Sequence, residues 1–198
     1  MGFLAPEVTT EHDALASFLE QQAAQLRLAA LDLTDGQARQ APLPSSLSIS
    51  GLLTHVAQVL AGWLERVRVA PADVGWNELA VLGDELGLGD GMYSGQEVPD
   101  LALDQILEIY DRAASRIRPI IEAADLDARV PVPDAPWFPD DLESWNARWV
   151  CNHLIAEVAR HVGHADVIRE AIDGEIAYSL NARAEGESFD WAEYTADE

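Results

Sequence analysis

Three histidines and one glutamate lie close together between residues 149 and 174, and all four side chains could bind a metal ion or move a proton. His153, Glu157 and His161 are spaced at i, i+4 and i+8, and His164 follows three residues later. On an α-helix this spacing stacks side chains on one face, with about 6 Å of rise between neighbours. Glu157 and His161, one turn apart, could reach one metal ion. The alternative is an amphipathic helix whose half-buried histidines are satisfied by hydrogen bonds.

A further ligand could come from a second helix, predicted over residues 49–69. Serines between residues 45 and 48 offer N-terminal caps, and Pro71 ends the pattern. His55 falls on the apolar face of this helix, beside Leu52 and Val59. A histidine on that face is either a core residue satisfied by a hydrogen bond or a ligand that points into the protein.

The elements that must position these side chains are helical. Apolar residues recur at three-to-four spacing in four long segments, and no alternating stretch is long enough to predict a sheet. The predicted helices cover residues 10–32, residues 49–69, a segment from Pro99 and Asp100 to Ile121, and a segment capped by Ser144 that ends at Gly174.

The connections between these helices carry weaker signals. Thr34 and Gln37 are spaced as a capping box, which predicts a short helical turn. Residues 71–100 are rich in glycine and acids, so we expect an irregular connection from which Trp76 and Tyr93 dock on the helices. Four prolines between residues 125 and 143 predict an extended crossover loop.

These elements predict an all-α protein built as a four-helix bundle. We expect a single domain over residues 1–198, in which residues 175–198 form a tail that packs through Tyr178, Phe189 and Trp191. Metal sites in such bundles combine one ligand from one helix with a pair at one-turn spacing from a facing helix. His55 with Glu157 and His161 fits that arrangement.

Composition excludes several classes of partner. The chain has 35 acidic and 12 basic residues and a formal charge of −23. This charge disfavours nucleic acid and anionic membranes as partners, and no apolar run reaches the 18 or more residues needed to span a bilayer. A single cysteine, Cys151, forbids an internal disulfide, and no secretion signal precedes Thr9, so we expect a cytoplasmic protein. Cys151 lies among apolar residues, where a thiol is usually buried and inert.

Four segments carry a resemblance to a known family: FLEQQAAQLRLAALDLTDGQAR, SSLSISGLLTHVAQVLAGWLERV, HLIAEVARHVGHADVIREAIDG and YSLNARAEGESFDW. With them the chain resembles the DinB-like, mycothiol-dependent maleylpyruvate isomerase superfamily, in particular its small actinobacterial members. The resemblance implies a four-helix bundle with up-down-down-up connectivity. It also implies a divalent metal, zinc or nickel, held by His55, Glu157 and His161, and a role for His164 beside the metal or facing the substrate.

The resemblance implies transfer of a low-molecular-weight thiol such as mycothiol to a small electrophile. Two imidazoles and a carboxylate leave at least one metal position open, and a metal there would favour the thiolate over the thiol. His164 and His153 are the candidate catalytic residues beside the metal, His153 also having the alternative of a helix-packing residue. Because few residues follow Gly174, we do not expect isomerisation of maleylpyruvate itself.

Two other functions remain open at this point. A metal-dependent hydrolase would use water at the same open position, with His164 or His153 as proton shuttle. A non-catalytic bundle, whose metal only joins two helices, would bind or sense a ligand. Apolar helical faces could also support a homodimer.

Overall fold

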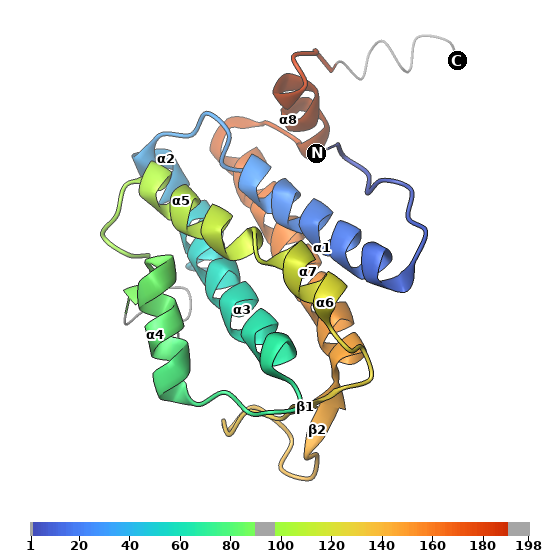
Figure 1. Cartoon of the computed structure of the whole chain (residues 1–198). Helices are drawn as coiled ribbons and strands as arrows, with labels where there is room; N and C mark the ends of the chain where they lie inside the picture. Colours follow the sequence, from blue (N-terminus) through green and yellow to red (C-terminus); the bar gives the residue numbers. More distant parts are fainter. Residues whose placement is uncertain (1, 90–97, 190–198) are drawn as a thin grey trace.

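The computed structural model describes residues 2–89 and 98–189, and its helices run lengthwise beside one another (Figure 1). The protein is therefore all-α in class, with one short sheet. The helices are α1 Glu11–Leu28, α2 Asp35–Ala38, α3 Ile49–Val69, α4 Trp76–Leu86, α5 Leu103–Ala114, α6 Ile117–Ala123, α7 Ala147–Asp173 and α8 Ala177–Ala184; the strands are β1 Arg129–Pro131 and β2 Ser144–Asn146. No helix among the described residues has the length and apolar character needed to cross a membrane.

Local signals explain where the long helices begin. The Thr10 hydroxyl accepts a hydrogen bond from the Asp13 amide at the start of α1, and Ser48 accepts from the Gly51 amide at the start of α3. Each cap satisfies a backbone donor that has no partner inside the helix. The prediction of residues 49–69 is confirmed, as is the capping box of Thr34 and Gln37 at α2.

The core lies where α3 packs against α5, α6 and α7, and where α1 packs against α6 and α7. Tyr110 of α5 is fully enclosed there, and its hydroxyl donates to the Ala23 carbonyl of α1. Burial of this apolar surface is the main favourable contribution to folding. The largest buried apolar side chains include Leu19, Leu26, Leu52, Leu60, Ile106 and Ile117.

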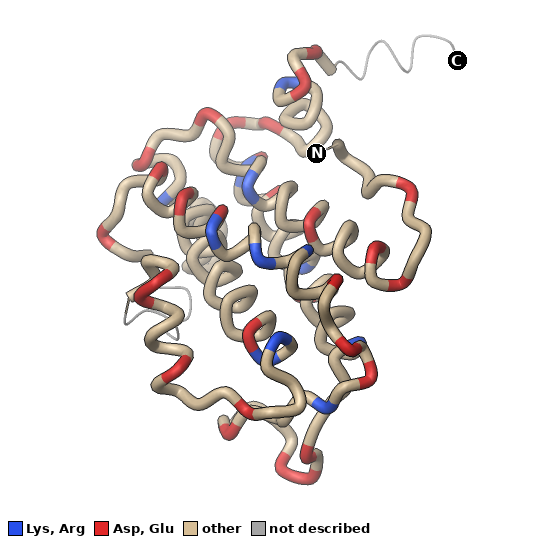
Figure 2. The backbone as a smooth tube through the Cα atoms, viewed as in Figure 1, with Lys and Arg blue, Asp and Glu red and all other residues tan. Residues whose placement is uncertain are grey.

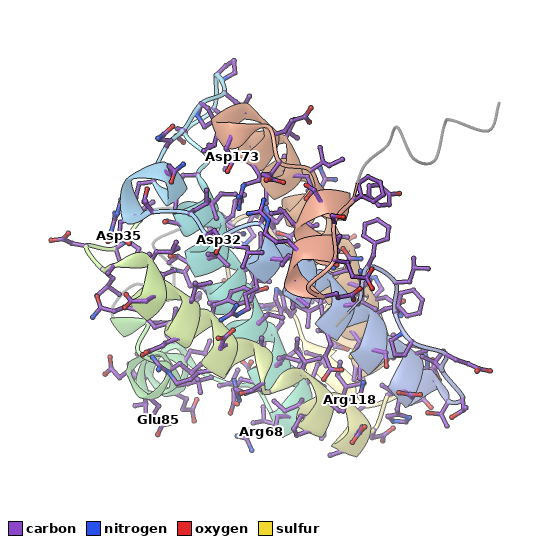
Figure 3. All side chains as sticks on the ribbon, turned by 90° about the horizontal axis from the view of Figure 1, so that it is seen from above. Asp32, Asp35, Arg68, Glu85, Arg118 and Asp173 are labelled. Atoms are coloured by element: carbon purple, nitrogen blue, oxygen red, sulfur yellow. The ribbon has the colours of Figure 1, made fainter. Side chains whose placement is uncertain are left out.

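Charged residues are spread along the whole described backbone (Figure 2). Seen from above, Arg68 and Glu85 point outward from the edges of their helices (Figure 3). Arg118 of α6 instead joins two helices, because its guanidinium contacts Asp13 and Glu20 of α1 at 3.2 and 2.6 Å.

The connection after α3 differs from the prediction. We expected residues 71–100 to be irregular, whereas α4 occupies Trp76–Leu86. The Glu78 carboxylate accepts the Gly75 amide at its start, and Gly87 ends it with a left-handed φ of 83°. Its buried Leu79 packs beneath α3 with Ala61 and Val74, so tertiary packing outweighs the glycines. Tyr93 lies outside the described residues.

The approach to α7 also differs from the prediction. Residues 129–131 pair antiparallel with residues 144–146, which places Ser144 in β2. The cap of α7 is therefore Asn146, whose side chain accepts from the Trp149 amide, and the assignment of Ser144 as cap was wrong. The prediction of one continuous helix up to Ile121 was also wrong, because a turn at Ser115 and Arg116 separates α5 from α6. The end of α7 at Gly174, with φ of 81°, is confirmed.

The segment after Gly174 packs on the rest of the protein through α8, which contacts α1. The ring of Tyr178 stacks on Phe3 at 4.6 Å and on Phe189 at 5.3 Å between centroids. These contacts agree with the expected packing of Tyr178 and Phe189. Trp191 lies outside the described residues.

Candidate metal centre

One residue of α3 and two residues of α7 meet in the core region between these helices. One ligand atom of each of His55, Glu157 and His161 lies within 4.8 Å of the others. The Glu157 Oε1 atom is 3.1 Å from His161 Nε2 and 3.7 Å from His55 Nε2. The two imidazole rings meet edge to face, with centroids 4.7 Å apart. The packing of α3 on α7 thus brings together residues about a hundred positions apart in the sequence.

The spacing of these atoms fits a divalent cation. Metal–ligand bonds of about 2.0–2.2 Å in a tetrahedral site place neighbouring ligand atoms about 3.3–3.6 Å apart. The observed 3.1 and 3.7 Å bracket that range, so small side-chain rotations would suffice. The donor set of two imidazoles and one carboxylate is typical of catalytic zinc sites. The residues present therefore fit the metal that the resemblance implies.

Electrostatics prepare Glu157 to act as an anionic ligand. The hydrogen bond from His161, followed by the close approach of His55, holds the pKa of the Glu157 carboxyl well below its usual value of 4.5, against an opposing effect of burial. His161 is nearly enclosed, while the side chains of His55 and Glu157 keep about a quarter of their surface exposed. The group is thus accessible from one side.

The other two histidines of α7 lie outside this group of three. The His164 ring is 5.8 Å from the His161 ring, and the Nδ1 atoms of both are buried without a hydrogen-bond partner in the described part of the chain. His153 stacks on Trp149 at 5.1 Å and meets the edge of Trp63 at 5.4 Å. His164 therefore borders the candidate centre, whereas His153 is part of an aromatic cluster.

Cys151 is enclosed and chemically quiet. Its side chain is fully buried, and burial raises the pKa of its thiol to about 11. A protonated thiol is a poor nucleophile. The expectation that Cys151 is inert agrees with this environment.

A cavity of about 320 Å³ opens beside His55. Sequence reasoning did not foresee it, because two of its walls come from segments distant in sequence. The signal that could have revealed one wall is the spacing of His55, Val59, Gly62 and Arg66, which lie on one face of α3. Trp76, expected to dock on the helices, also lines it. The remaining lining residues are Gln58, Trp63, Pro133, Trp137 and Phe138.

The fold and this group of side chains define an all-α protein with a His–Glu–His centre suited to a divalent cation. The sequence model of the mycothiol-S-transferase family matches residues 14–174, and the chain belongs to this DinB-like family. The match covers most of α1 and all of α2 to α7, and it includes all three residues of the centre.

One solved structure is similar in fold. The crystal structure of a conserved protein from Enterococcus faecalis superposes with a TM-score of 0.58 at 12% sequence identity, covering 85% of this chain and 100% of that chain. At this identity the likeness concerns the fold alone. Among proteins with curated descriptions, none matches this chain.

Proposed function

We propose that this protein is a metal-dependent transferase that joins a low-molecular-weight thiol, mycothiol or a related compound, to a small electrophile. The observation that carries the proposal is the convergence of His55, Glu157 and His161 in a chain of the mycothiol-S-transferase family. Neither the family nor the centre would suffice alone, since one fold can host several activities.

The proposal includes a DinB-like four-helix bundle in one domain spanning residues 1–198. In Figure 1, α1 and α7 run toward one end of the molecule, while α3 and the α5–α6 pair run toward the other, which supports up-down-down-up connectivity. The contact of α8 with α1 supports treating residues 175–198 as a tail of the same domain. A homodimer and a cytoplasmic location stay predictions.

The cation would be held by the imidazoles of His55 and His161 and the carboxylate of Glu157. Zinc suits this donor set, and nickel is an alternative. A bound divalent cation lowers the pKa of a thiol, so that the nucleophilic thiolate predominates near neutral pH. The three side chains come from α3 and α7, and the cavity beside His55 leaves room for reactants. A site that only joined helices would have no need of such a cavity.

The chain's own residues would position the reactants and take up the proton. The thiolate sulfur forms a bond to the electrophilic carbon, and the leaving group departs with the electron pair of its bond. We assign His164 the role of accepting the thiol proton, because its imidazole borders His161 and its buried Nδ1 atom has no partner among the described residues. His153 keeps a secondary role, since its ring is engaged with Trp63 and Trp149.

The first test measures metal content together with activity. We expect about one equivalent of divalent metal per chain in the reconstituted wild type and a loss of most of it in His55→Ala and Glu157→Gln, because each removes one of three protein ligands. With mycothiol and a chlorobimane, the wild type should form the thioether faster than the thiol alone, and a chelator should abolish the gain.

A matched control is His12→Gln. The His12 Nε2 atom contacts the Ala124 carbonyl at 3.0 Å and lies outside the metal group, so this variant should keep metal and activity. If the wild type binds no metal after reconstitution, the proposal fails. Metal binding without thioether formation by any tested electrophile would favour a binding protein, and product formation from water without thiol consumption would favour a hydrolase.

A further inference from the structure

The cavity beside His55 extends along α3 away from the metal group. One wall is the face of α3 that carries His55, Val59, Gly62 and Arg66, and the opposite walls are Trp76 of α4 and the segment 133–138. The start of α4 and this segment lie toward the same end of the molecule (Figure 1). From His55 to Arg66 the helix rises about 16 Å, which sets an upper limit on the length of a molecule bound between them.

The walls of the cavity are largely aromatic. Trp63, Trp76, Trp137 and Phe138 all line it, and the edge of Trp63 meets the ring of Phe138 at 5.7 Å. Flat apolar molecules bind well between such rings, in stacked or edge-to-face arrangements. At about 320 Å³ the cavity has the size of a small ligand pocket.

Gly62 keeps the middle of this wall open. A Cβ atom built on Gly62 meets no atom of the described residues within 4 Å, so a larger side chain would extend into the cavity. Glycine in a helix interior costs about 1 kcal/mol relative to alanine. Glycine at position 62 therefore lowers the stability of α3 relative to alanine, but it leaves more volume in the cavity.

Arg66 contributes a positively charged side chain to the wall of the cavity. Its residue is 7% exposed, and its single hydrogen bond within the described part of the chain runs from Nη1 to Asp73, at 3.0 Å. A guanidinium has five N–H donors, so the Nε and Nη2 donors stay available for a second planar anion. The Asp73 side chain is 64% exposed, so water screens its charge.

We propose that this cavity binds the electrophilic substrate, and that this substrate is a flat aromatic molecule carrying a carboxylate, with the carboxylate paired to Arg66 and the reacting carbon near His55. The inference rests on the proposed transferase function, which leaves the electrophile unspecified. The protein as a whole, at −23, repels anions. A preference for a carboxylate therefore requires a local positive group, and the Arg66→Met variant separates the effect of Arg66 from that of the cation proposed beside His55.

The sugar part of a thiol such as mycothiol fits this cavity poorly. Its many hydroxyl groups would need hydrogen-bond partners, and burying a polar group without one is costly. Besides His55, the described residues that line the cavity offer hydrogen bonds only through Gln58, Arg66 and the indole N–H groups of three tryptophans, fewer than the many hydroxyls of such a sugar would need. The thiol would therefore approach the metal group from another side.

The transfer to such a substrate balances as an aromatic substitution. The thiolate sulfur bonds to the ring carbon that carries a halide, and the carbon–halide bond breaks with its electron pair, releasing halide. The thiol proton passes to His164 and then to solvent. No oxidant or reductant is required.

The first experiment measures binding without reaction. Naphthoate and its uncharged amide, naphthamide, are titrated into metal-loaded protein and followed by tryptophan fluorescence and calorimetry. We expect naphthoate to bind about 10-fold or more tightly than naphthamide, because a buried guanidinium–carboxylate pair adds charge-assisted hydrogen bonds. Arg66→Met should remove this difference, and Gly62→Leu should weaken both ligands by about 10-fold or more, because the leucine fills the cavity.

Two control variants match these changes in chemistry but lie outside the cavity. Gly163→Leu fills open space at an exposed glycine of α7, and Arg68→Met removes an exposed charge from the same helix as Arg66. Both should leave the two affinities within about twofold of the wild type. Equal affinities for naphthoate and naphthamide in the wild type would overturn the role of Arg66. Unchanged binding in Gly62→Leu would overturn the cavity as the site.

The second experiment measures reaction and separates the two proposals. With mycothiol, para-chlorodinitrobenzoate should react with kcat/KM about 10-fold or more above that of its amide, and Arg66→Met should lose the preference. If the protein transfers the thiol to both substrates equally, the inference fails while the proposed function stands. If naphthoate binds as expected but no electrophile reacts, the cavity assignment stands and the proposed function fails. Competitive displacement of naphthoate by mycothiol would assign the cavity to the thiol and overturn the inference.

Discussion

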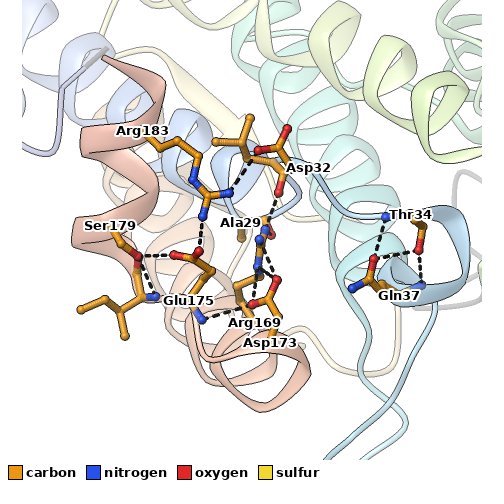
Figure 4. Close-up of polar contacts among 11 residues, drawn as sticks. Ala29, Asp32, Thr34, Gln37, Arg169, Asp173, Glu175, Ser179 and Arg183 are labelled. Atoms are coloured by element: carbon orange, nitrogen blue, oxygen red, sulfur yellow. Dashed lines mark hydrogen bonds and ion pairs between the residues drawn. The ribbon is translucent and has the colours of Figure 1, made fainter. Parts of the chain in front are cut away.

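Helix α7 carries two clusters of buried polar side chains, and they differ in how fully the protein satisfies their hydrogen bonds. Toward the C-terminal end, Arg169 is 2% exposed and donates from Nη1 to the carbonyls of Ala29 and Leu31, at 2.9 and 2.7 Å. Its remaining donors reach the Asp173 carboxylate, which also accepts the Glu175 amide (Figure 4). This cluster is closed, because the protein itself supplies the partners of the guanidinium.

The closed cluster also fastens α8 and the end of α1. Arg183 of α8 pairs with Asp32 and with Glu175, and Gln25 and Asn181 exchange two amide hydrogen bonds of 3.0 and 2.8 Å. Arg169 binds the carbonyls of Ala29 and Leu31 in the turn that follows α1, and so fixes the end of that helix against α7. The polar groups here hold three helices together.

The cluster nearer the middle of α7 is open. His55, Glu157 and His161 share a single short contact network, and the Nδ1 atoms of His161 and His164 are buried without partners within the described residues. A buried polar atom without a partner costs stability, and functional sites tolerate that cost. One helix can thus carry both a structural cluster and a ligand site. In the structural cluster the protein supplies all the hydrogen-bond partners, whereas in the ligand site some buried polar atoms have none.

The largest expected effect is the loss of Arg169. Arg169→Met should lower the free energy of unfolding by about 3–5 kcal/mol, because the Ala29 and Leu31 carbonyls lose their donor and Asp173 loses its buried partner. Urea denaturation followed by circular dichroism measures the change.

Two further variants test whether this effect belongs to the closed cluster. Arg183→Met removes a more exposed arginine, 41% accessible, and should cost less than about 1 kcal/mol. Glu157→Gln in metal-free protein should cost about 1–2 kcal/mol, less than Arg169→Met, since a glutamine can still accept from His161 and only the favourable charge is lost. If Glu157→Gln destabilises as much as Arg169→Met, the distinction between the two clusters is wrong.

A smaller effect, with a defined pH dependence, is expected for Asp173→Asn. Burial opposes ionisation of Asp173, but the hydrogen bonds from Arg169 and from the Glu175 amide outweigh it and keep the pKa below its usual value of 3.8. The unfolded chain thus binds the proton more readily, so the stabilisation is present above about pH 4 and is lost as the pH falls through the lowered pKa. Near pH 7 the variant should be less stable by about 1–2 kcal/mol.

The measurement is thermal unfolding of both proteins across the acidic range. Their stabilities should begin to approach each other near the usual aspartate pKa and converge below the lowered pKa of Asp173. Asp84→Asn, at an exposed position of α4, serves as control and should match the wild type at every pH. A constant difference between Asp173→Asn and the wild type would indicate that the lost charge is not the cause.

The long helices could be predicted because their signals are local. Ser48 and Pro71 bracket α3, and the left-handed Gly174 ends α7. Helix α4 could not be predicted in this way, because its apolar face is short and its stability depends on the contacts of Leu79 with α3. The misplaced cap at Ser144 has the same origin, because the pairing of β1 with β2 is a contact between segments that are distant in sequence.

The metal group was predictable in part for a similar reason. Spacing places Glu157 and His161 one turn apart, and the position of His55 on the apolar face of a second helix suggested the third ligand. The resemblance to the family agreed with His55 and selected His161 over His164. The structure brings the three predicted residues together. The closed cluster at Arg169 and the cavity with Arg66 were not predicted, since each depends on which helices lie side by side.

The smallest expected effect concerns Ser144, whose hydroxyl oxygen is buried without a partner within the described residues, like the Nδ1 atoms of His161 and His164. No other described residue of β2 has a buried polar atom without a partner. By the distinction between the two clusters, the Ser144 hydroxyl therefore slightly lowers the stability of the protein and does not belong to a ligand site. Ser144→Ala should change the free energy of unfolding by less than about 0.5 kcal/mol, or raise it, whereas Asn146→Ala should lower it by about 1 kcal/mol through loss of the α7 cap. Chemical denaturation of both variants measures this, and the metal content and activity of Ser144→Ala should equal those of the wild type. A clear loss of metal or of activity in Ser144→Ala would mean that a single buried polar atom without a partner can mark a functional site. The two clusters of α7 could then be distinguished only by the types of side chain they contain.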